Sequence, residues 1–187
     1  VIGTLREQGI LDDTIILFTA DHGDMLGKHG MWAKRVLYEE SAQVPMILSA
    51  PPRVGRNLVD DRLVGWQDVM PTLLSLTGID IPSSVEGRCM VSSERRSHLY
   101  GEYGIDATAT RMLHDGRFKL IYYSAGNRSQ LFDLEEDPEE LTDLWESEKH
   151  YEVGLRLQKL LIAELYGSDE TWVRDGALQG LPESEFQ

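Results

Sequence analysis

An Asp and a His stand side by side at the end of an apolar run, and a glycine-rich loop with a lysine follows them. Asp21 and His22 come directly after residues 14–20 (TIILFTA), and Lys34 lies further along the loop. A carboxylate oxygen and an imidazole nitrogen are suitable ligands for a divalent cation. A lysine ammonium is a compact charge that suits an anionic oxygen. We therefore expect Asp21 and His22 to bind a metal and Lys34 to hold a tetrahedral anion.

The same residues also fit structural roles, and the dipeptide alone does not decide between the two. Asp21 could cap a turn while His22 lies in a loop. His29, which stands between two glycines, either positions a leaving group or packs the loop. Glu39 and Glu40 are interpreted as the surface face of a short helix that begins near residue 36.

The elements that would carry these residues follow an α/β pattern up to about residue 84. Residues 14–20 and 44–50 are compact apolar runs, which predict strands buried on both faces, as in a parallel sheet covered by helices. Residues 67–76 have helical spacing of apolar side chains, and Gly78 is a plausible stop. The Asp-His pair would then lie at the carboxyl end of a strand, where α/β sheets bind their ligands.

The pattern changes after about residue 84. Asp115-Gly116 is a strong hairpin signal between two short apolar runs. A long amphipathic helix is predicted over residues 149–166. We therefore predict two domains, residues 1–84 and residues 85–187, the second with an antiparallel sheet and a C-terminal helix. Its strands are expected at residues 97–103, 109–113, 118–123 and 131–134.

The composition argues against some classes of protein. The 32 acidic residues against 18 lysines and arginines give a net charge of −14, which disfavours nucleic-acid binding. No apolar run approaches the roughly 20 residues that a membrane span needs. The ten acids of residues 133–152 are interpreted as a solvated surface. Cys89, the only cysteine, is expected to be a small buried hydrophobe.

These residues belong to an ordered set that closely resembles the C-terminal metal-site segment of the type I sulfatases, in the alkaline phosphatase superfamily. Each piece is weak by itself, but the set appears in the right order over about residues 1–165. The implied fold is the C-terminal part of an alkaline-phosphatase-like α/β/α sandwich, followed by a small α+β subdomain with an antiparallel sheet and a C-terminal helix. The pieces are TADHGDMLGKHGMWAK (19–34), YEESAQVPMIL (38–48), DVMPTLLSLTGI (68–79), VEGR (85–88), RMLHDGRFKLIYY (111–123) and LFDLEEDPEEL (131–141).

The resemblance implies a role for each candidate residue by its position. Asp21 and His22 match the family's second pair of metal ligands, Lys34 matches the lysine that contacts the sulfate ester, and His29 matches a loop histidine frequent in the family. The implied reaction is hydrolysis of a sulfate monoester, of a small molecule or a sugar, by a formylglycine made from Cys or Ser. The implied metal is Ca²⁺, with Mg²⁺ and Mn²⁺ as alternatives.

Two parts of that machinery are expected outside this chain. The family's nucleophile motif is C/S-x-P-x-R, and Cys89 does not fit it. The family's first ligand pair is Asp-Asp, but Asp12-Asp13 and Asp60-Asp61 stand in other contexts. We interpret the chain as the C-terminal portion of a sulfatase, with the formylglycine in a missing N-terminal part. We expect it to be inactive alone and to self-associate through an exposed sheet edge.

Two other functions stay open. A phosphonate monoester or phosphodiester hydrolase of the same superfamily would share the Asp-His pair and the nearby lysine. A non-catalytic module that binds partners through its acidic surface belongs to a different class. The ordered match of Asp21, His22 and Lys34 counts against that module, because a scaffold does not need to keep all three.

Overall fold

The computed structural model describes residues 1–50, 54 and 57–182. Contacts divide the chain into unit 1, residues 1–21 and 44–96, and unit 2, residues 22–43 and 97–187. This division differs from the sequence-based one at residue 84, since residues 85–96 belong to unit 1. They pack on the helix at residues 69–77. The amides of Arg88 and Met90 donate hydrogen bonds to the side chains of Asp68, just before this helix, and Thr72, within it.

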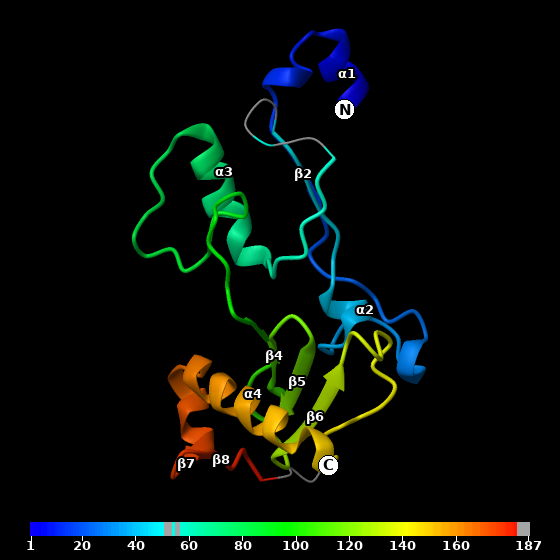
Figure 1. Ribbon diagram of the computed structural model, residues 1–187, viewed down its shortest axis with the longest axis vertical. Helices are drawn as coiled ribbons and strands as arrows, with labels where there is room; N and C mark the ends of the chain where they lie inside the picture. Colours follow the sequence, from blue (N-terminus) through cyan, green and yellow to red (C-terminus); the bar gives the residue numbers. More distant parts are fainter. Residues whose placement is uncertain (51–53, 55–56, 183–187) are drawn as a thin grey trace. The chain divides into compact units, whose positions relative to one another are not determined.

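The described residues of unit 1 form two short strands and two short α-helices, which can be followed in Figure 1. The strands β1 (Ile16–Thr19) and β2 (Met46–Ser49) form an antiparallel pair in which Phe18 faces Ile47. The helices are α1 (Ile2–Glu7) and α3 (Val69–Thr77), with 3-10 turns at Leu11–Asp13 and Trp66–Asp68.

The expectation of parallel-type strands buried on both faces is wrong for β1 and β2. A parallel pair needs a crossover that packs back onto the sheet, but the only α-helix between these strands, α2 (Glu39–Ala42), belongs to unit 2. The two strands pair antiparallel instead. Phe18 is 59% exposed and Ile47 is 60% exposed, so this pair leaves apolar surface uncovered in the described chain.

Asp68 organises the rest of unit 1. Its carboxylate is buried and accepts the amides of Gly65 at 2.9 Å and Arg88 at 2.8 Å. The hydroxyl of Thr72 accepts the amide of Met90 at 2.8 Å. These contacts show that the segments at 68–79 and 85–88 are partners in the fold. The predicted helix is confirmed as α3, and it ends at Gly78 in the left-handed conformation.

Unit 2 is built on a four-stranded antiparallel sheet in the order β3-β4-β5-β6. The predicted meander is therefore confirmed, and its central turn is set by Asp115, whose Oδ1 accepts the amides of Arg117 at 3.0 Å and Phe118 at 2.7 Å. The strands are β3 (Leu99–Tyr103), β4 (Thr110–His114), β5 (Phe118–Tyr123) and β6 (Arg128–Asp133).

The predicted long helix is confirmed as α4 (Tyr151–Glu164), which lies across one face of this sheet (Figure 1). Beyond it, the hairpin β7 (Val173–Arg174) and β8 (Ala177–Leu178) adds to the same side of the core. Further 3-10 turns span Lys28–Gly30, Asp106–Thr108, Glu148–His150 and Gly167–Trp172.

The two faces of the sheet carry separate apolar cores. Side chains alternate between the faces along a strand, so Leu120 packs with α4 while its neighbour Ile121 points the other way. Ile121 and Phe132 pack with three buried side chains of residues 22–43, namely Met25, Leu37 and Tyr38. The segment with the candidate chemistry is therefore the cover of the sheet's second face.

No helix among the described residues combines the length and the apolar character that crossing a membrane requires.

Candidate functional site

The structure brings His22 and Lys34 together. Lys34 Nζ is in hydrogen-bonding contact with His22 Nε2, and His22 Nδ1 lies 2.7 Å from the carbonyl oxygen of Gly23. Because a carbonyl oxygen only accepts, Nδ1 carries a hydrogen and Nε2 presents its lone pair to the lysine. A backbone carbonyl on one ring nitrogen is also the arrangement that orients metal-binding histidines through the other. The geometry thus suits His22 as a ligand.

Asp21 is exposed and follows the end of β1 by two residues. It is the last residue of the first stretch of unit 1, and His22 is the first residue of unit 2. Within residues 1–50, 54 and 57–182, no group of three or more His, Cys, Asp or Glu side chains is arranged to hold a metal ion. Asp21 and His22 offer an oxygen and a nitrogen donor, which fit a divalent cation but leave it short of ligands.

His29 packs the loop. Its ring stacks on the ring of Tyr38, with centroids 4.2 Å apart and an interplanar angle of 12°. The Tyr38 hydroxyl in turn donates to Gln130 Oε1 on β6 at 2.9 Å. His29 Nε2 is buried and has no hydrogen-bond partner in the described part of the chain. The packing role of His29 is what the structure shows, and its catalytic role stays a prediction.

Glu39 and Glu40 were expected on a surface face, and this expectation is wrong for both, since their side chains are only 22% and 21% exposed. The reason is clearest for Glu39. Its Oε1 accepts a hydrogen bond of 2.8 Å from Lys119 Nζ, and Lys119 is fully buried on β5. Lys119 also pairs with Glu140 Oε1 at 2.9 Å, and that carboxylate is fully buried as well. A buried ammonium requires carboxylate partners, so these acids are drawn inward.

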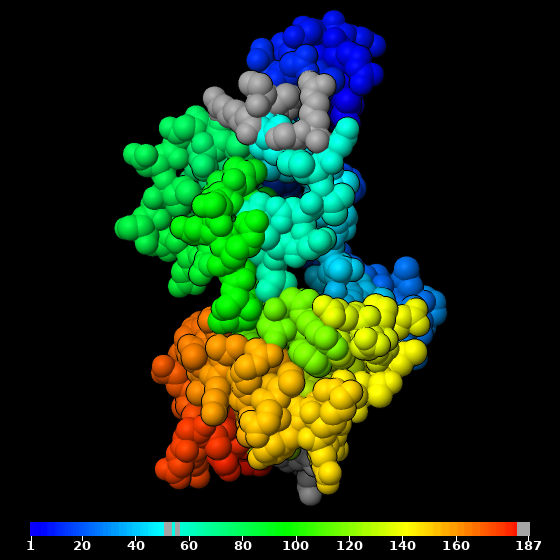
Figure 2. Space-filling view, in the orientation of Figure 1, coloured from blue at the N-terminus to red at the C-terminus, as the bar shows by residue number. Residues whose placement is uncertain are grey.

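The expectation that the acids of residues 133–152 form a solvated surface is also wrong in part. Asp133 and Glu140 are buried, whereas most of the other acids of residues 133–152 are exposed on the surface of unit 2, in yellow and orange in Figure 2. Lys119 was the signal for the burial of Glu140, since it is a lone charge inside the apolar run FKLIYY. It lies opposite Phe132 in the register of β5 and β6, on the face that residues 22–43 cover.

The short helix α2 braces the loop that carries His22 and Lys34. The amide of Gly23 donates to the carbonyl of Ser41 at 2.9 Å, and the Ser41 hydroxyl donates to the carbonyl of Lys34 at 2.9 Å. A Cβ on Gly23 would collide with the carbonyl oxygen of Glu40. The glycine after the Asp-His pair is thus required by the close approach of two backbone segments.

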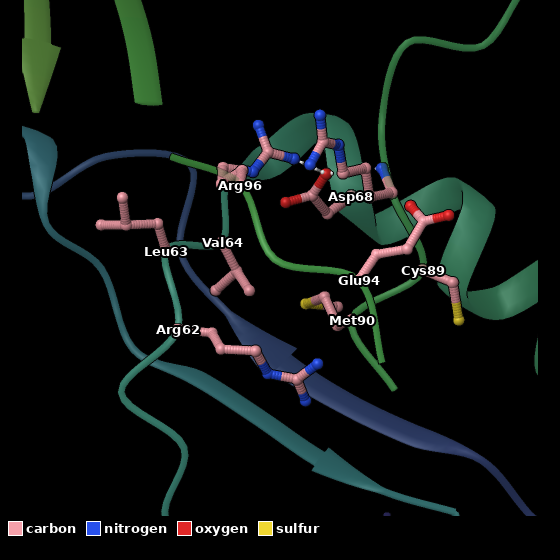
Figure 3. A pocket seen from close by; sticks show the side chains of 9 residues that line it. Arg62, Leu63, Val64, Asp68, Cys89, Met90, Glu94 and Arg96 are labelled. Atoms are coloured by element: carbon pink, nitrogen blue, oxygen red, sulfur yellow. Dashed lines mark hydrogen bonds and ion pairs between the residues drawn. The ribbon is translucent and has the colours of Figure 1, made fainter. Parts of the chain in front are cut away.

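A separate pocket in unit 1 is lined by Asp68 and by Arg62, Arg88 and Arg96, and Figure 3 shows Arg96 beside Asp68. Arg96 pairs with Asp68, Arg62 pairs with Asp60, and Arg88 donates to the carbonyl of Arg95 at 2.9 Å. These arginines are therefore engaged in holding the fold.

Cys89 also lines that pocket, and it is half-buried, not fully buried as expected. It lies on the returning segment 85–96, which covers α3 only in part, since Met70 on α3 stays 48% exposed.

The expectation that the nucleophile motif is missing needs one correction. Residues 49–53 read SAPPR, which fits the spacing C/S-x-P-x-R. Ser49 ends β2 and faces Ile16 in the strand register, while residues 51–53 lie outside the described residues. This run follows the Asp-His pair in the chain, whereas in the family order the nucleophile precedes it. We therefore keep the interpretation that the nucleophile lies outside this chain.

Comparison with known proteins gives a consistent assignment. The family described as N-sulphoglucosamine sulphohydrolase, C-terminal, matches residues 27–166, which include His29 and Lys34. The chain is 38% identical to an arylsulfatase of Clostridium perfringens over 98% of its own length and 40% of that protein. It is also 38% identical to a choline-sulfatase of Rhizobium meliloti over 79% of its length and 30% of that protein.

Solved structures agree on the fold. The phosphonate monoester hydrolase of Silicibacter pomeroyi matches with a TM-score of 0.76 at 29% identity, over 87% of this chain and 36% of that one. The chain therefore spans less than half the length of each of these three proteins.

Proposed function

Because this chain belongs to the sulfatase family described as N-sulphoglucosamine sulphohydrolase, C-terminal, we propose that the polypeptide containing it hydrolyses sulfate monoesters. The observation that carries the proposal is the contact between Lys34 Nζ and His22 Nε2 on a loop braced by α2. This contact supports the proposal, because an ammonium suits an anionic ester and an imidazole nitrogen suits a divalent metal.

Each candidate residue takes one role in this proposal. Asp21 and His22 hold the divalent metal, Ca²⁺ or alternatively Mg²⁺ or Mn²⁺, which polarises the sulfuryl oxygens when bound. Lys34 holds a sulfuryl oxygen by its ammonium. The lone pair of His22 Nε2 serves either Lys34 or a metal, so Lys34 is available to the ester once His22 is a ligand. His29 keeps the loop against Tyr38.

The nucleophile is proposed to be a formylglycine in a part of the polypeptide outside this chain. The substrate is a sulfated small molecule or sugar, and its identity depends on residues beyond this loop. A phosphonate monoester or phosphodiester hydrolase is the second candidate, since the Silicibacter pomeroyi enzyme shares the fold at 29% identity.

The experiment that separates the candidates compares two substrates on the complete polypeptide. Rates are measured with 4-nitrophenyl sulfate and with a 4-nitrophenyl phenylphosphonate, before and after chelation of divalent metals. We expect the sulfate ester to give the higher kcat/KM, and both rates to fall on chelation and recover with Ca²⁺. A higher kcat/KM for the phosphonate would favour the second candidate, and no turnover of either would refute both.

A further inference from the structure

We propose that Lys119, Glu39 and Glu140, here named the Lys119 cluster, position the loop that carries His22 and Lys34. The proposal rests on the proposed function for the importance of that loop. It assigns Lys119 and Glu140, which lie outside the loop, as positioning residues. The cluster acts on the loop through α2, and each step of this connection is a contact within unit 2.

The first step is the burial of the cluster itself. The side chains of Lys119 and Glu140 are fully buried and that of Glu39 is 22% exposed. One ammonium lies between two carboxylates, at 2.8 Å from Glu39 Oε1 and 2.9 Å from Glu140 Oε1. Charges in such a place are costly unless they are paired in one geometry. The cluster therefore accepts little displacement of Glu39.

The second step connects Glu140 to the backbone of α2. Glu140 Oε2 accepts the amide of Glu39, the first residue of α2, at 2.6 Å. Glu140 itself has a φ of 54°, a conformation that residues with a side chain rarely adopt. Such backbone strain persists only where the surroundings hold it, and it often marks a functional constraint. Glu140 thus fixes α2 at two points, through the amide and through Lys119.

The third step leads from α2 to the candidate site. The carbonyl oxygen of Ser41 accepts a hydrogen bond from the amide of Gly23. The hydroxyl of Ser41 donates one to the carbonyl of Lys34, and both are 2.9 Å long. Gly23 is also the residue whose carbonyl holds His22 Nδ1. One short helix therefore holds the backbone of Gly23, next to His22, and the backbone of Lys34.

Apolar packing alone would hold the loop less specifically. Met25, Leu37 and Tyr38 pack on Ile121 and Phe132, and such contacts are not directional. The hydrogen bonds from the Glu39 amide to Glu140 and from Lys119 to Glu39 fix distance and angle, whereas buried ion pairs add little net stability. If the cluster served stability alone, apolar side chains could replace it at a small cost in the free energy of unfolding. The geometry therefore favours positioning as the role of the Lys119 cluster.

The test measures amide hydrogen exchange in the complete polypeptide with Glu140→Ala. The matched control is Asp169→Ala, which removes a carboxylate from another buried pair of unit 2, Arg111–Asp169, at 2.7 Å. Peptides that cover residues 22–43 should exchange at least about tenfold faster in Glu140→Ala, because the loop opens locally. In Asp169→Ala the same peptides should exchange as in the wild type.

A milder variant keeps the test informative if Glu140→Ala does not fold. Glu140→Gln retains an oxygen for the amide of Glu39 but loses the charge that pairs with Lys119. It should therefore give an intermediate increase of exchange in residues 22–43. Unchanged exchange in both Glu140 variants, or an equal increase in Asp169→Ala, would overturn the proposal and leave a purely structural cluster.

Activity supplies the second readout. With a sulfate ester, Glu140→Ala should lower kcat/KM by about tenfold or more, since small misplacements of catalytic groups are costly. Its effect should be smaller in a Lys34→Ala background, because the two residues act through one loop. The effects of Asp169→Ala and Lys34→Ala on kcat/KM should multiply in the double variant. If the effects of Glu140→Ala and Lys34→Ala also multiplied, the proposal would be contradicted. If the wild type turns over no sulfate ester, the proposed function fails, while the exchange test still decides the positioning.

Discussion

Gly23 lies so close to Glu40 that a Cβ on the glycine would overlap the carbonyl oxygen of the glutamate. This approach brings the chain after the Asp-His pair onto α2, where the amide of Gly23 donates to Ser41. The candidate chemistry therefore depends on a residue with no functional group. The close approach to Glu40 also explains why a glycine directly follows His22.

Gly23→Ala should lower the activity more than the addition of one methyl group suggests. A methyl group there forces the two backbone segments apart, so the Gly23–Ser41 hydrogen bond is lost and His22 moves. We expect kcat/KM of the complete polypeptide to fall by about 10² if the shift approaches 1 Å. The control is Gly3→Ala, where a Cβ would meet nothing within 4 Å. Equal kcat/KM for the two variants would contradict the close-approach argument.

Lys34→Ala should lower kcat/KM by about 10² to 10³, the range for one lost donor to a developing oxyanion. Its stability should change little, because the side chain is exposed on a loop. Asp21→Ala should instead lower metal content together with activity, because it removes a ligand. Steady-state kinetics with metal analysis separates the two variants.

Lys28→Ala is the matched control for Lys34, as a second lysine of the same loop. Lys28 pairs with Glu139 on the surface, and exposed pairs contribute little. Near-normal kcat/KM of Lys34→Ala with its metal retained would make Lys34 a bystander.

The sequence predicted the four-stranded sheet, α3 and α4 because each had a strong local signal, but it did not predict the β7–β8 hairpin. The Asp115-Gly116 turn located the β4–β5 hairpin, and leucine spacing located α4. The pairing of β1 with β2 was not predictable in this way, since an apolar run does not reveal the direction of its partner. Lys34 was predicted from its place at the end of the glycine-rich loop after His22, and the structure brings the two side chains into contact while the role of Lys34 stays a prediction.

The Lys119 cluster could not be assembled from the sequence. Its members are separated by 80 residues between Glu39 and Lys119 and by a further strand to Glu140. Only the register of the sheet places Lys119 on the face that residues 22–43 cover. A lysine within an apolar strand indicates a buried partner without identifying it.

Ser49→Ala should leave the activity of the complete polypeptide unchanged. Ser49 fits the spacing of the nucleophile motif in SAPPR, but it stands on β2, with an exposed side chain, after the Asp-His pair in the chain. Kinetics with a sulfate ester provide the measurement, and mass spectrometry of the peptide with residue 49 shows whether its serine is oxidised to formylglycine. A serine aldehyde at position 49, with loss of turnover in the variant, would place the nucleophile within this chain.

Acid should destabilise the polypeptide in part through Asp133. Its pKa is lowered by hydrogen bonds from Arg117, so the ionised form is favoured in the folded state. That contribution is present above the ordinary carboxyl range and is lost as pH falls through the lowered pKa, between about pH 5 and pH 2. Asp133→Asn should be less stable than the wild type near neutrality, with the difference shrinking over that interval. Urea unfolding at stepped pH measures it, and a difference independent of pH would contradict the argument.

The isolated 187-residue chain should self-associate through the β1–β2 pair. Phe18 and Ile47 face each other in register and are both more than half exposed, at 59% and 60%. Among the described residues, each strand of this two-stranded sheet also has one edge without a ladder partner, and such edges favour pairing with another chain. Replacing both residues by lysine should shift light scattering at high concentration towards the monomer, because the charges repel and the apolar area is lost. The control is Ile105→Lys, which changes another exposed apolar residue, at 75%, in unit 2. A wild-type chain that is monomeric at high concentration, or an equal effect of the control, would show that this surface does not drive association.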